Sequence, residues 1–197
     1  MFTWRTKKAR MKSYQITEWV HSFLKDHVMP GDLCIDATMG NGNDTALLSK
    51  LAGKDGHVLA FDIQEAALDH TKEKLRREEC PSNYELILAS HETMGEYAGE
   101  NTVSCITFNL GYLPGGDHAL ATKAHSSIKA IETGLGLLKK KGLMTVCIYS
   151  GKDSGFEEKE AVLSYIKGLD PKKFLVIVSE YANRPNHPPI PVLIIKL

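Results

Sequence analysis

The chain has 197 residues, of which 43% are hydrophobic and 24% are charged, a composition typical of one globular domain. Lys and Arg together number 24, as do Asp and Glu, so the zero net charge gives no overall indication of nucleic-acid binding. The longest apolar runs are too short to span a bilayer, and no apolar segment of a secretory signal follows the basic start. We therefore expect a cytoplasmic protein without a membrane segment, with residues 1–13 as a basic arm and residues 14–197 as a single domain.

The first predicted element is a helix over residues 14–29, where apolar residues recur at helical spacing until Pro30 and Gly31 end it. Strands and helices then alternate. Strands are predicted over residues 33–37, 57–62, 84–89, 103–108, 143–149, 174–179 and 190–197, and helices over 43–51, 64–79, 118–138 and 156–167. This alternation predicts a parallel α/β sheet with helices on both faces. The connection of about ten residues between the last two strands is too short for a parallel crossover, so we expect these two to be antiparallel.

Candidate ligand-binding residues follow the carboxyl ends of the strands, because ligands of open α/β sheets bind there. After the first strand the chain reads DATMGNGNDT, in which Gly40 and Gly42 allow a tight turn that a ligand can approach closely. Asn43 or Asp44 can cap the helix that follows, whose free N–H groups face the same point. A glycine turn without a ligand is the alternative.

Asp62 ends the second strand, at the spacing from the glycine turn at which a carboxylate binds the ribose hydroxyls of an adenosine. An exposed N-cap of the next helix is the alternative role for Asp62. Gln64 is expected near the same ribose or base. Ser90 and His91 follow the third strand and are expected near the adenine edge, a position that is compatible with an N-cap role for Ser90.

Two nucleotide cofactors compete for this pattern. A NAD site requires a third glycine where Thr45 stands, and its pyrophosphate disfavours the carboxylate of Asp36 at the end of the first strand. S-adenosylmethionine has a cationic sulfonium, an ammonium group and no phosphate, so acidic and amide side chains suit it. The sequence favours S-adenosylmethionine, with Asp36 and Asp44 among its predicted contacts.

The fourth strand ends in NLGYLPGGD, in which Asn109 is followed by a turn and by the aromatic Tyr112. This pattern is similar to the Asn/Asp-Pro-Pro-Tyr signature of amino-group methyltransferases, with Leu110 and Gly111 in place of the two prolines. An amide oxygen accepts the hydrogens of an amine, and an aromatic ring packs on a planar base or a cation. We therefore assign Asn109 and Tyr112 to the acceptor, with a Gly/Pro turn without chemical function as the alternative.

The motifs DATMGNGNDT, FDIQ, ASHE, NLGYLPGGD and NRPNHPP together resemble the bacterial proteins named "putative rRNA methylases". That family is similar to the tRNA 5-(aminomethyl)-2-thiouridine methyltransferases, which act on wobble uridine. The resemblance implies a Rossmann-like, doubly wound, mostly parallel seven-stranded sheet with an antiparallel last strand. It implies S-adenosylmethionine-dependent methylation of the aminomethyl nitrogen in the tRNA anticodon stem-loop. It also implies that Asn41 and Asn43 lie in the cofactor loop.

The candidates for substrate binding are Leu113, Tyr149, Arg184 and Asn186, with Arg184 expected on a phosphate. Local basic groups are the expected RNA contacts, namely the N-terminal arm, residues 139–141 and Arg184. None of the eight histidines forms a familiar ligand pair with a cysteine or carboxylate, so we expect no metal. A small-molecule or rRNA methyltransferase of the same fold and a non-catalytic nucleotide-binding module remain alternatives. The oligomeric state is open, with a homodimer among the alternatives.

Overall fold

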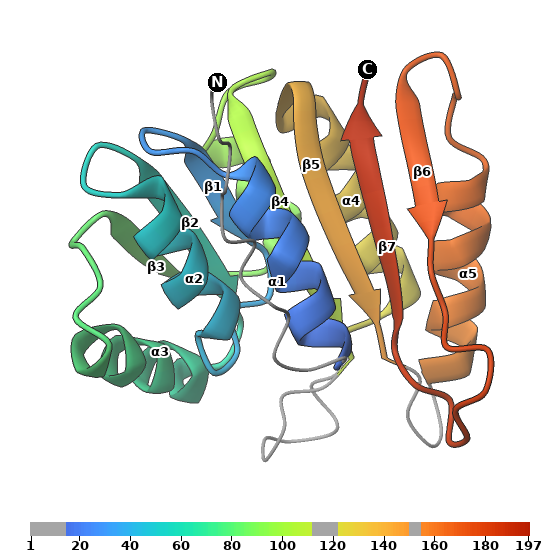
Figure 1. Cartoon of the computed structure of the whole chain (residues 1–197), viewed down its shortest axis with the longest axis horizontal. Coiled ribbons are helices and arrows are strands. Elements are labelled where there is room, and N and C mark those ends of the chain that lie inside the picture. The colour runs from blue at the N-terminus through green and yellow to red at the C-terminus, as the bar shows by residue number, and fades with distance from the viewer. Residues whose placement is uncertain (1–14, 112–121, 150–154) are drawn as a thin grey trace, which may run out of the picture.

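The computed structural model in Figure 1 describes residues 15–111, 122–149 and 155–197. The predicted basic arm and the candidates Tyr112 and Leu113 lie outside these ranges. The strands are β1 Leu33–Asp36, β2 His57–Asp62, β3 Tyr84–Leu88, β4 Val103–Leu110, β5 Leu138–Ile148, β6 Phe174–Val178 and β7 Ile190–Lys196. The helices are α1 Ile16–His27, α2 Asn43–Ala52, α3 Glu65–Arg77, the 3-10 helix η1 His91–Glu96, α4 Ala124–Leu137 and α5 Gly155–Lys167.

The described strands form one seven-stranded sheet in the order β3-β2-β1-β4-β5-β7-β6. Strands β1 to β5 pair in parallel, whereas β7 is antiparallel to both β5 and β6. The predicted fold class is confirmed, and the antiparallel strand lies inside the sheet rather than at its edge. The strand order reverses at β1, between β2 and β4, and such a switch point opens a crevice beyond the carboxyl ends of the strands.

Helices cover both faces of the sheet (Figure 1). On one face, α1 and α2 pack against the strands through a cluster that includes Leu24 and Leu48, and Ala67 of α3 packs beside it on β2. On the other face, α4 and α5 cover a larger cluster around Phe108 and Ile131. The sheet therefore has a buried core on each side, which gives the loops at its carboxyl edge a rigid support.

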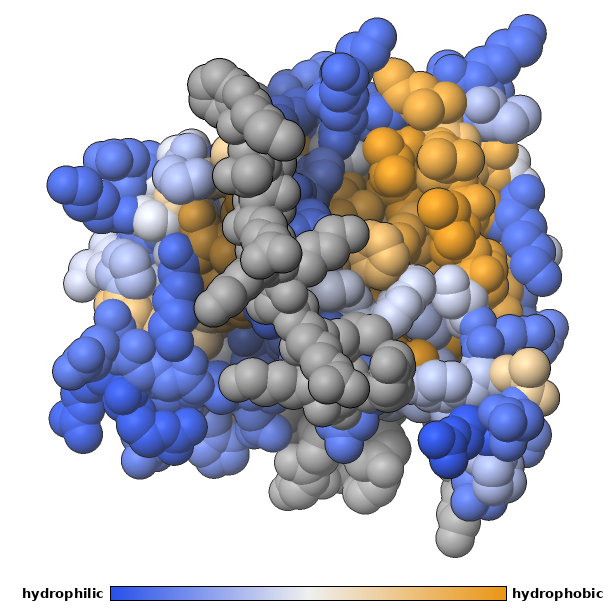
Figure 2. All heavy atoms as spheres, in the orientation of Figure 1, coloured by the Kyte–Doolittle hydropathy of each residue, from blue (hydrophilic) through white to orange (hydrophobic). Residues whose placement is uncertain are grey.

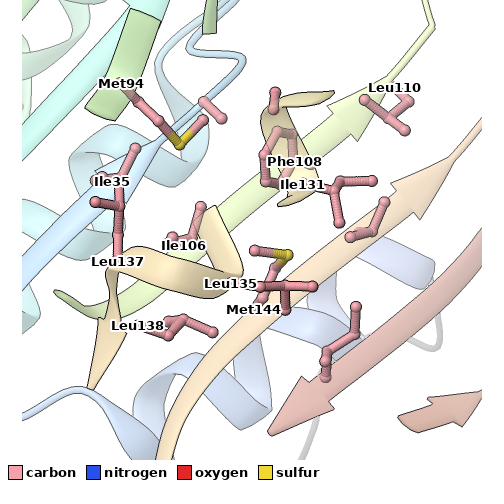
Figure 3. Close-up of a cluster of buried hydrophobic side chains, with 14 of the residues drawn as sticks. Ile35, Met94, Ile106, Phe108, Leu110, Ile131, Leu135, Leu137, Leu138 and Met144 are labelled. Carbon is pink, nitrogen blue, oxygen red and sulfur yellow. The ribbon is translucent and has the colours of Figure 1, made fainter. Parts of the chain in front are cut away.

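Figure 3 shows the larger cluster, in which side chains of α4 meet those of β1, β4 and β5. Helix α4 approaches the sheet closely at Gly134, where an added Cβ would lie 2.7 Å from Met144 Cε and 3.1 Å from Ile106 Cδ1. Glycine thus permits the close packing of α4 on the sheet, and a side chain here would force the end of Met144 to move.

The face that carries α1 is only partly covered. Ile16, Val20 and Leu24 form the buried side of α1. Trp19 is partly buried and packs against the same cluster, whereas Phe23 is exposed. The two rings meet edge-to-face with 4.7 Å between their centroids. Figure 2 shows apolar side chains gathered on this face over β6 and β7, next to α1. None of the helices in the described ranges is long and apolar enough to cross a membrane.

Two predicted boundaries are wrong. The described part of α4 begins at Ala124 rather than near residue 118, because its N-cap Lys123 is extended and the Thr122 backbone N–H donates to Gly111 O (3.0 Å). Strand β5 begins at Leu138, which pairs with Val103 before the register shifts to Cys105 and Leu143. Residues 139–141 occupy this irregular start of β5, at the edge of the sheet opposite the carboxyl ends.

Candidate functional site

A pocket of about 760 Å³ opens at the carboxyl ends of the parallel strands. The segments that follow β1, β2, β3, β4 and β5 all contribute to its lining. The predicted site residues that line it are Gly40, Asn41, Asn43, Asp44, Asp62, Gln64, Ser90, His91, Asn109 and Tyr149. Sequence reasoning therefore identified residues that are far apart in the chain and that the fold gathers around one pocket.

The glycine loop after β1 is held between β2 and α3. Gly42 has a φ of +73°, and a Cβ there would come within 2.8 Å of Thr71 Oγ1 on α3. The Gly40 N–H donates to Asp62 Oδ2 (3.0 Å), and Thr71 Oγ1 donates to the Gly40 carbonyl (3.2 Å). Glycine thus allows both the left-handed backbone and the close approach of α3. The N-cap of α2 is Gly42, without a side-chain cap, so the predicted capping by Asn43 or Asp44 is wrong.

The carboxylate of Asp62 is fixed by two backbone groups. Oδ2 accepts from Gly40 and Oδ1 accepts from the Gln64 N–H, each at 3.0 Å. The N-cap of α3 is Gln64, so the alternative of a capping role for Asp62 is not what the structure shows. Each carboxylate oxygen has a second lone pair, so the fixed carboxylate can accept further hydrogen bonds from a ligand.

His91 lines the pocket, and one nitrogen of its ring is buried. The residue is 9% exposed, and within the described part of the chain its Nε2 has no hydrogen-bond partner. Burial lowers the pKa of His91, which favours the neutral imidazole. A buried polar atom without a partner is costly unless a ligand satisfies it. Beside it, Ser90 Oγ accepts from the Glu92 N–H (3.3 Å), which confirms the N-cap role of Ser90.

Asn109 is bound to the glycine-loop segment at two points. Its backbone N–H donates to Thr38 Oγ1 (2.7 Å), and its side-chain Nδ2 donates to Asp44 Oδ2 (2.8 Å). No residue of the described ranges donates to its Oδ1. The amide oxygen is therefore a free acceptor of Asn109, and Nδ2 retains a second hydrogen.

A residue that sequence reasoning missed completes this cluster. His21 Nε2 lies 2.6 Å from Asp44 Oδ1, so α1 contacts the first turn of α2 through a polar pair. Thr17, four residues earlier on α1, lines the pocket itself. The available signal was their spacing: Thr17 and His21 flank the apolar side of α1 and, four residues apart, face the same neighbour.

Asp36 does not reach the pocket surface. Its carboxyl is fully buried, where it accepts from Thr45 Oγ1 (2.6 Å) and from the Thr38 N–H (3.3 Å). Burial, and secondarily the charge of Asp44, raise the pKa of Asp36 to about 7. The structure therefore assigns Asp36 to support of the glycine loop, and its predicted cofactor contact is corrected.

The remaining candidates for substrate and RNA binding lie in three different places. Tyr149 lines the pocket, and burial raises its pKa to about 12. Arg184 and Asn186 are exposed beside the pocket rather than in its lining, which their neighbours His187 and Pro189 reach. Residues 139–141 lie at the opposite edge of the sheet, where Lys139 Nζ donates to Asp32 Oδ1 (2.8 Å).

Neither a metal-ligand cluster nor a reactive strand thiol is found in the described part of the chain. Across residues 15–111, 122–149 and 155–197, no group of three His, Cys, Asp or Glu residues is arranged to hold a metal ion. Cys34, Cys105 and Cys147 are buried free thiols within strands. Burial raises the pKa of each of these thiols, which makes them poor nucleophiles.

The fold has close counterparts among solved structures. A "putative rRNA-methylase" of Clostridium thermocellum is 43% identical, with a TM-score of 0.90 over 94% of this chain and 99% of that chain. A "putative methyltransferase" of Streptococcus mutans, solved in complex with SAH, is 40% identical, with a TM-score of 0.83 over 92% of this chain and 97% of that chain.

This strand order, with a glycine loop after β1 and a fixed carboxylate after β2, defines the class of S-adenosylmethionine-dependent methyltransferases. Residues 58–195 match the family described as "Putative rRNA methylase". The chain belongs to this family, as the sequence motifs predicted.

Two curated relatives illustrate the range of the similarity. The Arabidopsis thaliana protein named "tRNA (mnm(5)s(2)U34)-methyltransferase, chloroplastic" is 35% identical over an alignment of 184 residues that covers 87% of this chain and 66% of the plant protein. The Klebsiella pneumoniae "Ubiquinone/menaquinone biosynthesis C-methyltransferase UbiE" is 34% identical over 84 residues, 43% of this chain and 33% of that protein. The chain thus spans only part of the length of either relative.

Proposed function

We propose that this protein transfers a methyl group from S-adenosylmethionine to the aminomethyl nitrogen of 5-aminomethyl-2-thiouridine at the wobble position of tRNA. The observation that carries the proposal is the Asn109 amide, whose nitrogen is held by Asp44 and whose oxygen is left for the pocket. An oriented amide oxygen suits an acceptor that is an amine. The name of the Arabidopsis relative supports a tRNA wobble uridine as the substrate.

The residues of the pocket fit the proposed cofactor. Asp62 would accept from the two ribose hydroxyls, because its carboxylate is fixed and retains lone pairs. His91 and Ser90, which line the pocket side by side, would lie at the adenine. Gly40, Asn41 and Asn43 would present backbone and amide groups of the loop to the remainder of the molecule. When bound, S-adenosylmethionine supplies a methyl group on a cationic sulfur, which an amine lone pair can attack.

The acceptor must lose a proton before it can react. A primary alkylamine resembles a lysine side chain, with a pKa of about 10.4, and its ammonium form has no lone pair. Desolvation in the pocket and a nearby sulfonium charge would lower the pKa of the amine. We assign the released proton to water. The oxygen of Asn109 would then hold one N–H of the neutral amine and aim its lone pair at the methyl group.

The RNA contact is proposed for the exposed segment between β6 and β7. His187 and Pro189 from this segment line the pocket, and Arg184 stands exposed beside them. An arginine at the rim of a pocket can bind a backbone phosphate while the base enters. This position favours Arg184 over residues 139–141, which lie at the opposite edge of the sheet.

The test is methyl transfer from labelled S-adenosylmethionine to three substrate pools: tRNA carrying unmethylated aminomethyl groups, ribosomal RNA and a metabolite extract. We expect label in tRNA alone. Label in ribosomal RNA or in small metabolites would replace the proposed substrate with one of those classes. Binding of the donor without transfer to any pool would favour a non-catalytic nucleotide-binding module and contradict the proposal.

A further inference from the structure

We infer that His21, on the helix that precedes the sheet, is a positioning residue that fixes the side-chain amide of Asn109 through Asp44. The connection to acceptor chemistry rests on the function proposed above. The connection between the three side chains rests on their geometry alone. One measurement tests this contact, and another tests its effect on methyl transfer.

The three side chains form a continuous chain of hydrogen bonds. His21 Nε2 lies 2.6 Å from Asp44 Oδ1, and Asn109 Nδ2 lies 2.8 Å from Asp44 Oδ2. The side chains of His21 and Asp44 are 14% and 12% exposed, so water competes weakly for these bonds. Short bonds in partly buried surroundings hold their partners more firmly than bonds at the surface.

The donors and acceptors can be arranged in only one way while Asp44 is ionised. A carboxylate has no proton to give, so His21 Nε2 must carry a hydrogen and donate it to Oδ1. For the same reason Asn109 must turn its NH₂ group toward Oδ2, because a flipped amide would set two acceptor oxygens 2.8 Å apart. The carboxylate therefore decides which end of the Asn109 amide faces the pocket.

The role of His21 follows from what would hold Asp44 without it. Asn109 engages only Oδ2, so loss of the His21 bond would free Oδ1 and allow the carboxylate to rotate. The neighbour of Asp44 on its other side is the buried Asp36, whose pKa is raised in part by the charge of Asp44. A carboxyl group at that position does not replace the hydrogen bond from His21. Helix α1 thus sets the acceptor geometry in addition to packing on the sheet.

The experiment compares three variants of the full chain. His21→Ala removes the donor, and His21→Gln offers an amide N–H in a similar place. His27→Ala is the matched control, since His27 is a half-buried histidine of the same helix whose Nε2 lies 3.2 Å from the Ser104 carbonyl oxygen, at the other end of the sheet. A general weakening of α1 would affect His21→Ala and His27→Ala alike.

The first measurement is ¹⁵N–¹H NMR of the Asn109 carboxamide, assigned with Asn109→Ala. In the wild type, His21→Gln and His27→Ala, we expect one Nδ2 proton to have a chemical shift typical of a hydrogen bond and to exchange slowly with solvent. In His21→Ala this protection should be lost. An Asn109 amide that is unchanged in His21→Ala would overturn the inference, whatever the substrate proves to be.

The second measurement is the single-turnover rate of methyl transfer at saturating donor. We expect His21→Ala to slow transfer on the order of tenfold, because the Asn109 amide is no longer held in alignment. Donor affinity should be unchanged, and His21→Gln should restore most of the rate. In the Asn109→Ala background His21→Ala should add nothing, because both changes act on the same group. An equal loss in both backgrounds would overturn the inference. Absence of transfer to tRNA by the wild type would instead refute the proposed function and leave the NMR comparison to decide the positioning role.

Discussion

The carboxylate of Asp44 and the side-chain amide of Asn109 are 2.8 Å apart, although 65 residues separate them in the chain. Asp44 belongs to the segment after β1 and Asn109 to the end of β4, and these two strands are neighbours at the point where the strand order reverses. The contact joins the proposed cofactor loop to the proposed acceptor site. Substitution of Asn109 should therefore slow methyl transfer while the protein still binds the methyl donor.

Asn109→Ala should lower turnover on the order of a hundredfold, because the oxygen that positions the amine is lost. Donor affinity should change little, since Asp62 and the glycine loop remain. Single-turnover kinetics and calorimetry with the donor check the two parts. Loss of donor binding with normal turnover of the bound complex would show that Asn109 acts on the cofactor.

Asn109→Asp provides the matched variant, because it retains an oxygen but replaces the donor that Asp44 requires. Two carboxylates would then share a 2.8 Å contact, which disfavours ionisation of both. We expect Asn109→Asp to be at least as slow as Asn109→Ala at neutral pH. Activity at the level of the wild type would contradict the role given to the Asp44 contact.

Asp62→Ala should weaken donor binding by roughly 1.5–3 kcal/mol, the loss expected for hydrogen bonds to a charged group. Glu65→Ala is the control, because Glu65 is an exposed carboxylate in the first turn of α3 and is not part of the pocket lining. Calorimetry on both folded variants makes the comparison. Equal affinity in Asp62→Ala and Glu65→Ala would remove Asp62 from the proposed ribose site.

Asp36 should make stability depend on pH. Its pKa is raised from 3.8 to about 7 in the folded protein, so between these values the folded state holds a proton that the unfolded chain releases. Stability should therefore fall as pH rises through this window, by up to about 1.4 kcal/mol per pH unit, and level off above it. Asp36→Asn, which is neutral throughout, should remove that part of the slope.

Urea unfolding of the wild type and Asp36→Asn at several pH values across the window measures this difference. The two free energies of unfolding should change relative to each other as pH rises. Parallel pH profiles would mean that Asp36 is ionised in the folded protein over the whole range.

Arg184→Ala should weaken tRNA binding and reduce the slope of log affinity against log salt by about one, the effect of one phosphate contact. Lys140→Ala is the control, because Lys140 is exposed at the opposite edge of the sheet. Binding titrations at several salt concentrations test both. A larger effect for Lys140→Ala would move the RNA surface to that edge.

The strand ends that build the pocket were predictable from the sequence. Short apolar runs that end in polar or glycine-rich segments mark the carboxyl edge of a parallel sheet, and this is how Asp62, His91 and Asn109 were found. Their gathering around one pocket follows from the parallel pairing, which sequence alternation indicates directly. The fold class follows from the same alternation.

Contacts between segments that are distant in the chain were not predictable in this way. Periodicity identified the apolar side of α1, but it does not indicate where that helix docks, so the pairing of His21 with Asp44 was missed. Local rules assigned Asp44 to capping α2 because the nearest backbone N–H groups belong to that helix. Asp36 was expected at the ligand because it ends β1, whereas its side chain turns inward to Thr45.

Methyl transfer to the aminomethyl nitrogen is tested most directly with two synthetic anticodon stem-loops. One carries 5-aminomethyl-2-thiouridine at the wobble position, and the other carries 2-thiouridine there. Nucleoside mass spectrometry after incubation with S-adenosylmethionine locates any added methyl group. We expect one methyl group on the aminomethyl nitrogen of the first stem-loop and none on the second. Equal methylation of both stem-loops, or a methyl group on any other nucleoside, would contradict it.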